Sequence, residues 1–158
     1  MDTATRDRLV NDYLAGPKQL RQAIAGMSQE QLKARPVAGK MSTLEVVCHL
    51  VDFDPVYVER MKRAIAMDNP TLLGADENDF ARVLCYHDRD AEEELKLLEY
   101  TRSSMAKILN KIPLESWGRI GQHKERGPMT VQKMVETMIN HIPHHVKFIE
   151  EKRRTLKV

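Results

Sequence analysis

The sequence predicts an all-α protein, a four-helix bundle that forms a single domain over residues 1–158. The chain is 158 residues long, with 42% hydrophobic and 30% charged residues, which suits one domain with one core. Only 5% of its residues are aromatic. Its abundant Leu, Met, Ala, Glu, Lys and Arg lose little rotamer freedom in a helix. The glycines leave four long segments in which apolar residues recur every three or four positions, as on one face of a helix.

The first helix is expected from about residue 5 to residue 25. Its apolar positions follow helical spacing, and Gly16-Pro17 predicts a kink, because proline lacks the amide proton that an inner helical turn needs. Ser28 then caps a short turn, SQEQL, before the loop ARPVAGKM.

The second helix has the clearest start. Ser42 and Glu45 form a capping box, in which each side chain satisfies a backbone amide of the first turn. One apolar stripe continues from there to the end of the helix near Met67, and Pro55 is expected to bend it.

The second half of the chain contains the other two helices. Residues 68–80 make a long connection with room for a short helix, and a third helix follows over 88–111 with an acidic first turn. Residues 112–129 are predicted to be a polar loop. The fourth helix covers 130–154 and ends in basic residues, the sign of charge that a helix C-terminus favours.

The charge balance and the cysteine content exclude several classes of protein. Lys and Arg number 25 against 23 Asp and Glu, so the surplus of basic residues typical of nucleic-acid binders is missing. No apolar run approaches the ~20 residues of a membrane span, and charges interrupt the first 14 residues, so neither a membrane anchor nor a signal peptide is expected. Cys48 and Cys85 suit neither a disulfide framework nor a cysteine-only zinc site. We therefore expect a cytoplasmic protein with reduced thiols.

Three histidines lie on the inner sides of two predicted helices. His145 falls within the apolar arc of the last helix and His141 at its edge, one turn apart, whereas His144 falls on the polar flank. Imidazoles at i and i+4 can bind one metal ion. His49, at the edge of the apolar face of the second helix, is the candidate third ligand. Three protein ligands with one open position are typical of a catalytic zinc site.

Zinc is the first expectation for three imidazoles. Nickel, iron and manganese remain open, because metal selectivity depends on geometry and supply as well as on ligand type. Other metal motifs are missing: the sequence has no E-x-x-H of a di-iron bundle and no H-E-x-x-H of a zinc protease.

Two segments of the sequence resemble a known family. MSTLEVVCHLVDFD at 41–54 and GPMTVQKMVETMINHIPHHVKFI at 127–149 are similar in order and spacing to the DinB-like superfamily, which includes metal-dependent hydrolases of the YfiT type. The resemblance covers roughly residues 5–152. It implies an up-down-down-up bundle with a longer crossover, a divalent metal held by His49, His141 and His145, and a homodimer. It also implies hydrolase activity or transfer of a low-molecular-weight thiol.

The chain departs from the family pattern at two positions. Met41 stands where tryptophan is frequent. Pro143 lies between the two histidines of the last helix and cannot donate to the carbonyl of Ile139. Such a proline either widens the site or spoils the i, i+4 geometry.

Two further residues are candidates for catalysis. Asp52, one turn beyond His49, can orient a ligand imidazole or act as a base, although its position off the apolar arc also suits a solvated carboxylate. His123, just before the last helix, can approach the open side of the metal or lie in a surface loop. Cys48 is expected to point away from the apolar stripe and to be unreactive.

Three functions remain open at this point. The first is a metal-dependent enzyme in which the metal activates water or a thiolate for attack on a small-molecule substrate. The second is a stress-associated bundle that binds a metal or ligand without turnover. In the third, the histidines merely hydrogen-bond inside a helical bundle.

Overall fold

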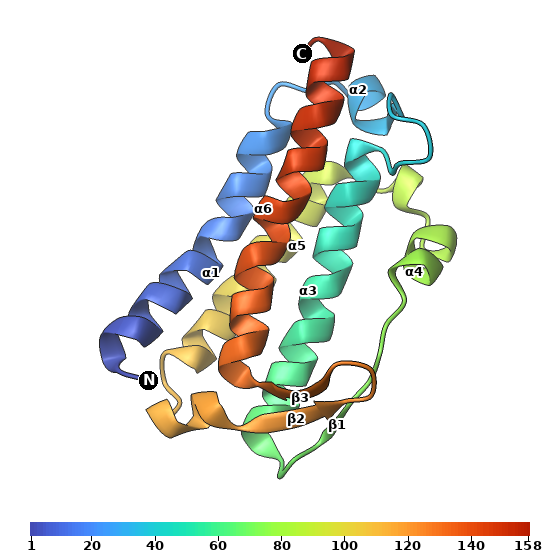
Figure 1. Cartoon of the computed structure of the whole chain (residues 1–158). Helices are drawn as coiled ribbons and strands as arrows, with labels where there is room; N and C mark the ends of the chain where they lie inside the picture. Colours follow the sequence, from blue (N-terminus) through green and yellow to red (C-terminus); the bar gives the residue numbers. More distant parts are fainter.

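Four long helices lie side by side in the computed structural model, which describes all 158 residues. They are α1 (Thr3–Ile24), α3 (Thr43–Ala66), α5 (Ala91–Leu109) and α6 (Val131–Leu156). Figure 1 shows α1 and α6 running in one direction and α3 and α5 in the other. The predicted four-helix bundle and its up-down-down-up order are therefore confirmed.

No helix combines the length and the hydrophobicity that crossing a membrane would require.

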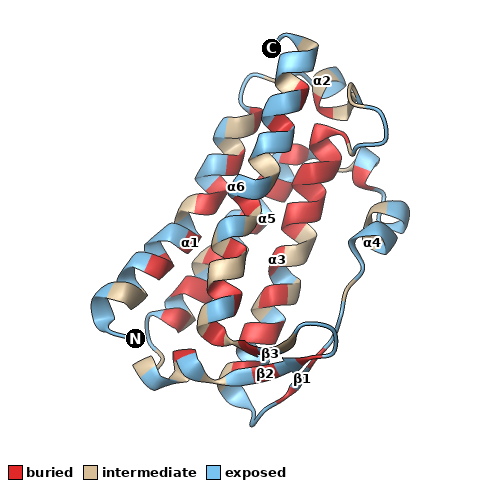
Figure 2. Cartoon of the chain, in the orientation of Figure 1, coloured by how far each residue is buried: buried red, intermediate tan, exposed pale blue.

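The buried side chains line the inner faces of these helices (Figure 2). They form two apolar clusters, of 16 and 15 residues, towards the two ends of the bundle. Along α3 and α5 the clusters are separated by Asp54 and Arg102, which are 1% and 0% exposed. The bundle thus has a polar layer at mid-height.

The helix starts follow the predicted capping chemistry. The Ser42 hydroxyl accepts a hydrogen bond from the Glu45 amide at 3.1 Å, and the Glu45 carboxylate accepts one from the Ser42 amide at 2.7 Å. The Asp90 carboxylate caps α5, so this helix begins at Ala91 and not at residue 88. The reason is that Tyr86–Asp88 form a separate 3-10 turn, η1.

Proline does not interrupt the long helices. Helices α1, α3 and α6 continue through Pro17, Pro55 and Pro143. Each proline nevertheless deprives the carbonyl four residues earlier of its amide donor, so that carbonyl needs another partner.

The connection between α3 and α5 crosses the whole height of the bundle (Figure 1). It contains β1 (Thr71–Leu72), α4 (Glu77–Val83) and η1, and a further short helix, α2 (Gln29–Lys33), precedes α3. Because the chain returns to its starting end, α5 runs parallel to α3. The short helix expected within 68–80 is α4, which begins at Glu77 inside that segment and ends three residues beyond it.

The prediction of a polar loop at 112–129 is wrong. This segment forms a 3-10 turn, η2 (Leu114–Gly118), and an antiparallel hairpin of β2 (Ile120–His123) and β3 (Gly127–Thr130). β1 pairs in parallel with β2, so that Leu72 lies opposite His123. A Cβ added at Gly121 would come within 2.7 Å of the Leu72 side chain, so the close contact between the strands requires glycine there.

Candidate metal centre

The structure brings together three imidazoles from two helices. His49 extends from α3 and is 1% exposed, whereas His141 and His145 extend from α6 and are half-buried. The Nε2 atoms of His49 and His141 are 3.2 Å apart. Each of the three rings offers a nitrogen within 4.8 Å of the others. We call His49, His141 and His145 the histidine cluster.

Pro143 leaves the spacing of the α6 histidines intact. Helix α6 is continuous from Val131 to Leu156, and the rings of His141 and His145 lie with their centroids 4.8 Å apart. Pro143 itself is exposed, on another side of the helix from the cluster. Of the two outcomes that the sequence left open, the structure therefore shows the retained i, i+4 arrangement.

The histidine cluster is held in its neutral form. Burial, which disfavours a charged imidazolium, lowers the pKa of His49, and lowers the pKa of His141 to about 3 and that of His145 to about 4. The other histidines of the cluster add to the shifts of His141 and His145, because neighbouring positive charges repel one another. Neutral imidazole is the form that binds a metal ion.

Two nitrogen atoms of the cluster have no partner. The Nδ1 atoms of His49 and His141 are buried and make no hydrogen bond. A core in which histidines served only as hydrogen-bonding residues would be expected to satisfy such atoms. Three neutral, convergent nitrogen donors match the donor set that zinc and related divalent ions prefer, so the residues fit a bound metal.

The mid-bundle polar layer holds the two helices of the cluster in register. The Arg102 guanidinium, on α5, donates to the Asp54 carboxylate on α3, to the Tyr13 carbonyl on α1 at 2.9 Å and to the Met138 carbonyl on α6 at 3.1 Å. One side chain of α5 therefore contacts the other three long helices. Asp54 follows His49 by five residues, and Met138 precedes the first histidine of α6 by three.

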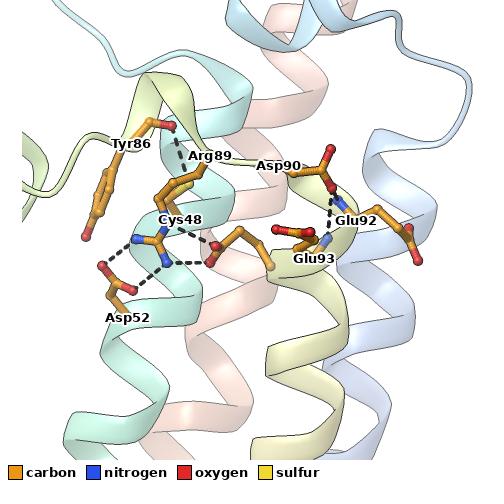
Figure 3. A network of polar contacts seen from close by, with 8 residues as sticks. Cys48, Asp52, Tyr86, Arg89, Asp90, Glu92 and Glu93 are labelled. Atoms are coloured by element: carbon orange, nitrogen blue, oxygen red, sulfur yellow. Dashed lines mark hydrogen bonds and ion pairs between the residues drawn. The ribbon is translucent and has the colours of Figure 1, made fainter.

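Asp52 is not the solvated carboxylate that its helical position suggested. Its two oxygens accept hydrogen bonds from Nη1 and Nη2 of Arg89, at 2.9 and 3.0 Å, and the Asp52 side chain is 16% exposed (Figure 3). Arg89 also pairs with Glu94 at 2.6 Å. Through these two hydrogen bonds Asp52 links α3 to the start of α5, and both of its oxygens are directed to Arg89.

Cys48 also lies elsewhere than predicted. Its side chain is buried in the apolar core, not turned away from it, with Sγ 3.5 Å from the Tyr86 carbonyl. Burial raises the pKa of the Cys48 thiol to about 12, which agrees with the expectation of an unreactive thiol. His144 is exposed and stays outside the cluster, as its polar flank predicted.

His123 lies on β2 and not in a surface loop. It is 4% exposed, and its Nδ1 accepts hydrogen bonds from the backbone amides of Glu125 and Arg126 at 3.2 and 3.3 Å. Since Nδ1 is an acceptor, the neutral ring carries its proton on Nε2. His123 and His141 both line a cavity of about 130 Å³.

Glu77 is a member of this site that the sequence did not reveal. Its Oε2 atom is 3.8 Å from Nε2 of His49, and the side chain lines the same cavity. Glu77 begins α4, in the connection between α3 and α5. No spacing rule relates a residue in such a connection to a histidine on α3, so only the folded chain brings the two together.

Comparison with known proteins agrees with the architecture. The model of the DinB superfamily matches residues 13–149. A protein of Oceanobacillus iheyensis named "Putative metal-dependent hydrolase" is 25% identical over 140 residues, which cover 89% of this chain and 81% of that protein. A protein of Bacillus cereus with the same name is 26% identical over 140 residues, covering 89% of this chain and 80% of its own.

A solved structure shows the same fold. YfiT from Bacillus subtilis, described as a probable metal-dependent hydrolase with an unusual four-helix bundle topology, superposes with a TM-score of 0.91 at 21% identity. The match covers 99% of this chain and 90% of that one. With its family model spanning most of the sequence and its bundle reproduced, this chain belongs to the DinB superfamily.

Proposed function

We propose that this protein is a metal-dependent hydrolase that acts on a small molecule. The observation that carries the proposal is the histidine cluster: three neutral imidazoles offer nitrogens within 4.8 Å of one another, and one of these rings also lines a cavity. The names of the relatives from Oceanobacillus and Bacillus support the same chemistry.

The residues of the cluster and of the cavity wall have different roles in this proposal. His49, His141 and His145 would hold the ion, with His141 facing the cavity in which a substrate can lie. A bound zinc ion would lower the pKa of a water molecule and polarise the substrate. Glu77, beside His49 on the cavity wall, would orient a water molecule in the cavity by accepting a hydrogen bond from it.

The first experiment measures metal content. Protein purified after expression in zinc-supplemented medium is expected to carry about one equivalent of zinc by elemental analysis, and His145→Ala is expected to lose most of it because one of three ligands is gone. His144→Ala is the matched control, since this exposed histidine is on the same helix and outside the cluster. Wild-type protein with little metal, or equal loss in both variants, would count against the proposal.

The second experiment identifies the nucleophile. Zinc-loaded protein is assayed with 4-nitrophenyl acetate alone, and with 1-chloro-2,4-dinitrobenzene in the presence and absence of cysteine. Hydrolysis of the ester that disappears in His145→Ala supports water as the nucleophile. Turnover that requires added cysteine would instead support transfer to a low-molecular-weight thiol, and metal without turnover in either assay would favour a binding protein.

A further inference from the structure

The cavity beside the histidine cluster contains a buried cation that lacks an acidic partner. Arg60, on α3, is 3% exposed, and its Nε and Nη2 atoms both donate to the carbonyl of Leu73. Its guanidinium stacks over the Tyr57 ring, with 5.0 Å between Cζ and the ring centroid. No carboxylate oxygen of the chain lies within 4.0 Å of it.

The other fully buried arginine has a carboxylate partner. Arg102, which is 0% exposed, pairs with Asp54 at 2.7 Å, and the half-buried Arg89 pairs with Asp52 and Glu94. A buried charge is costly unless a counter-charge compensates for it. Arg60 is therefore the buried arginine without a carboxylate partner in the chain, and an external anion would compensate for its charge.

Further hydrogen-bond donors line the same cavity. The Tyr57 hydroxyl accepts a hydrogen bond from Nη1 of Arg126 at 2.9 Å, which leaves its own proton free to donate. Because Nδ1 of His123 is occupied by backbone amides, this ring presents Nε2–H as a donor. Arg60 thus belongs to a group of four donor side chains around one space, namely Tyr57, Arg60, His123 and Arg126.

Two acidic residues of the cavity do not neutralise this group. Glu77 is 58% exposed at its side chain and lies against His49, on the side of the histidine cluster. Glu125 is exposed at the rim and forms no ion pair with either cavity arginine. The charge of Arg60 is therefore buried, whereas Glu125 is exposed and Glu77 lies beside the metal ligands.

We propose that the four donor side chains bind an anionic oxygen group of the substrate, a carboxylate or a phosphate. Arg60 keeps three N–H donors, two on Nη1 and one on Nη2, beyond the two that it gives to Leu73, and such neighbouring donors match the oxygens of either group. The cavity of about 130 Å³ suits a small molecule. The inference rests on the proposed function in one respect: the bound acid would present its reacting group to the histidine cluster.

The test uses metal-free protein, because the anions used as probes also bind zinc. Malonate and inorganic phosphate are titrated into the protein in EDTA, with binding followed by calorimetry and by the Arg60 Nε–H resonance in ¹H–¹⁵N spectra. Malonamide, which has the shape of malonate without its charge, is the neutral control. We expect malonate or phosphate to bind and to shift the Arg60 resonance, and malonamide to bind at least about tenfold more weakly.

Variants assign the binding to the cavity. Arg60→Met, which keeps the length of the side chain without its charge, is expected to weaken anion binding at least about tenfold, as the loss of a charged hydrogen bond does. Arg63→Gln is the matched control on the same helix, because Arg63 is paired with Glu59 at the surface. Arg126→Gln, at an exposed position, is the second variant should Arg60→Met fail to fold, and it is expected to weaken binding about threefold or more.

The results separate this inference from the proposed function. If neither anion binds the wild type, if malonamide binds as well as malonate, or if Arg60→Met and Arg63→Gln bind alike, the anion site is wrong. Zinc content, measured on separate samples of the same preparations, is independent of these titrations. Normal zinc content without anion binding overturns only the substrate class, whereas anion binding without zinc uptake overturns the metal-dependent mechanism.

Discussion

Replacing two histidines of the cluster by leucine should have opposite effects with and without metal. The double variant His49→Leu/His141→Leu removes two buried Nδ1 atoms that have no partner and the contact between the two Nε2 atoms at 3.2 Å. In a protein whose histidines are structural, this change would only destabilise. In a protein whose histidines bind a metal, the metal-free form contains buried nitrogen atoms without hydrogen-bond partners, and the variant removes them.

The magnitude follows from these contacts. A buried group without a partner costs about 1–3 kcal/mol, so two such nitrogens cost about 2–6 kcal/mol, and one hydrogen bond contributes about 0.5–1.5 kcal/mol. The metal-free variant should therefore exceed the wild type by at least about 0.5 kcal/mol. With zinc at 1,000 times its dissociation constant, the wild type alone gains about 4.1 kcal/mol. In a chain of this size, that gain corresponds to about 8–16 °C in Tm.

The assay is thermal unfolding followed by circular dichroism, in EDTA and in excess zinc. His144→Leu serves as control, because this histidine is exposed on the same helix and should leave the zinc-induced shift unchanged. A double variant that is less stable than the wild type by more than about 2 kcal/mol in EDTA would mean that the histidines stabilise the fold by themselves. A wild type whose Tm does not respond to zinc would refute the metal site.

Three further predictions concern stability. Because burial holds the pKa of His141 at about 3 and that of His145 at about 4, only the unfolded chain takes up their protons as pH falls below ~6.5. The free energy of unfolding of the metal-free protein should therefore be constant above that pH and fall by up to about 1.4 kcal/mol per pH unit per histidine towards pH 4. Urea titrations at several pH values measure it, and a flat profile would contradict the burial of the two rings. Gly16→Ala should destabilise the protein by about 1–3 kcal/mol although alanine favours helices, because the added Cβ would lie 2.2 Å from Nη1 of Arg102. A variant that is more stable than the wild type in urea unfolding would contradict this. Ser42→Ala should cost about 1 kcal/mol by removing the cap of α3, and an unchanged urea midpoint would show that the cap contributes nothing.

The sequence predicts the long helices well, because each of them carries its own signals. The capping box at Ser42 and Glu45 marks the start of α3 within one residue, since it depends on atoms only three positions apart. The β2–β3 hairpin is missed for the opposite reason. Its strands have four residues each, and β2 is completed by β1, some 50 positions earlier in the chain. A polar four-residue strand has no periodicity strong enough to distinguish it from a loop.

The histidine cluster is visible in the sequence for a similar reason. His141 and His145 are related by one helical turn, and His49 lies at the edge of a clear apolar stripe, so local periodicity alone directs them inward. Arg60 and Glu77 carry no such signal. Arg60 resembles the surface arginines around it, and its burial depends on the β1 segment whose Leu73 carbonyl it meets.

The feature predicted as a kink, Gly16-Pro17, has a positive role that only the structure explains. Pro17 cannot donate to the carbonyl of Tyr13, which would otherwise accept the amide four residues later. The Arg102 guanidinium fills that vacancy at 2.9 Å, and it can approach α1 closely because residue 16 has no Cβ. The same guanidinium also binds carbonyl and carboxylate groups of α3 and α6. The Gly16-Pro17 irregularity in α1 therefore binds Arg102, the residue that holds α3 against α6. Because His49 lies on α3 and the other two histidines of the cluster lie on α6, the position of Arg102 also sets the distance between them.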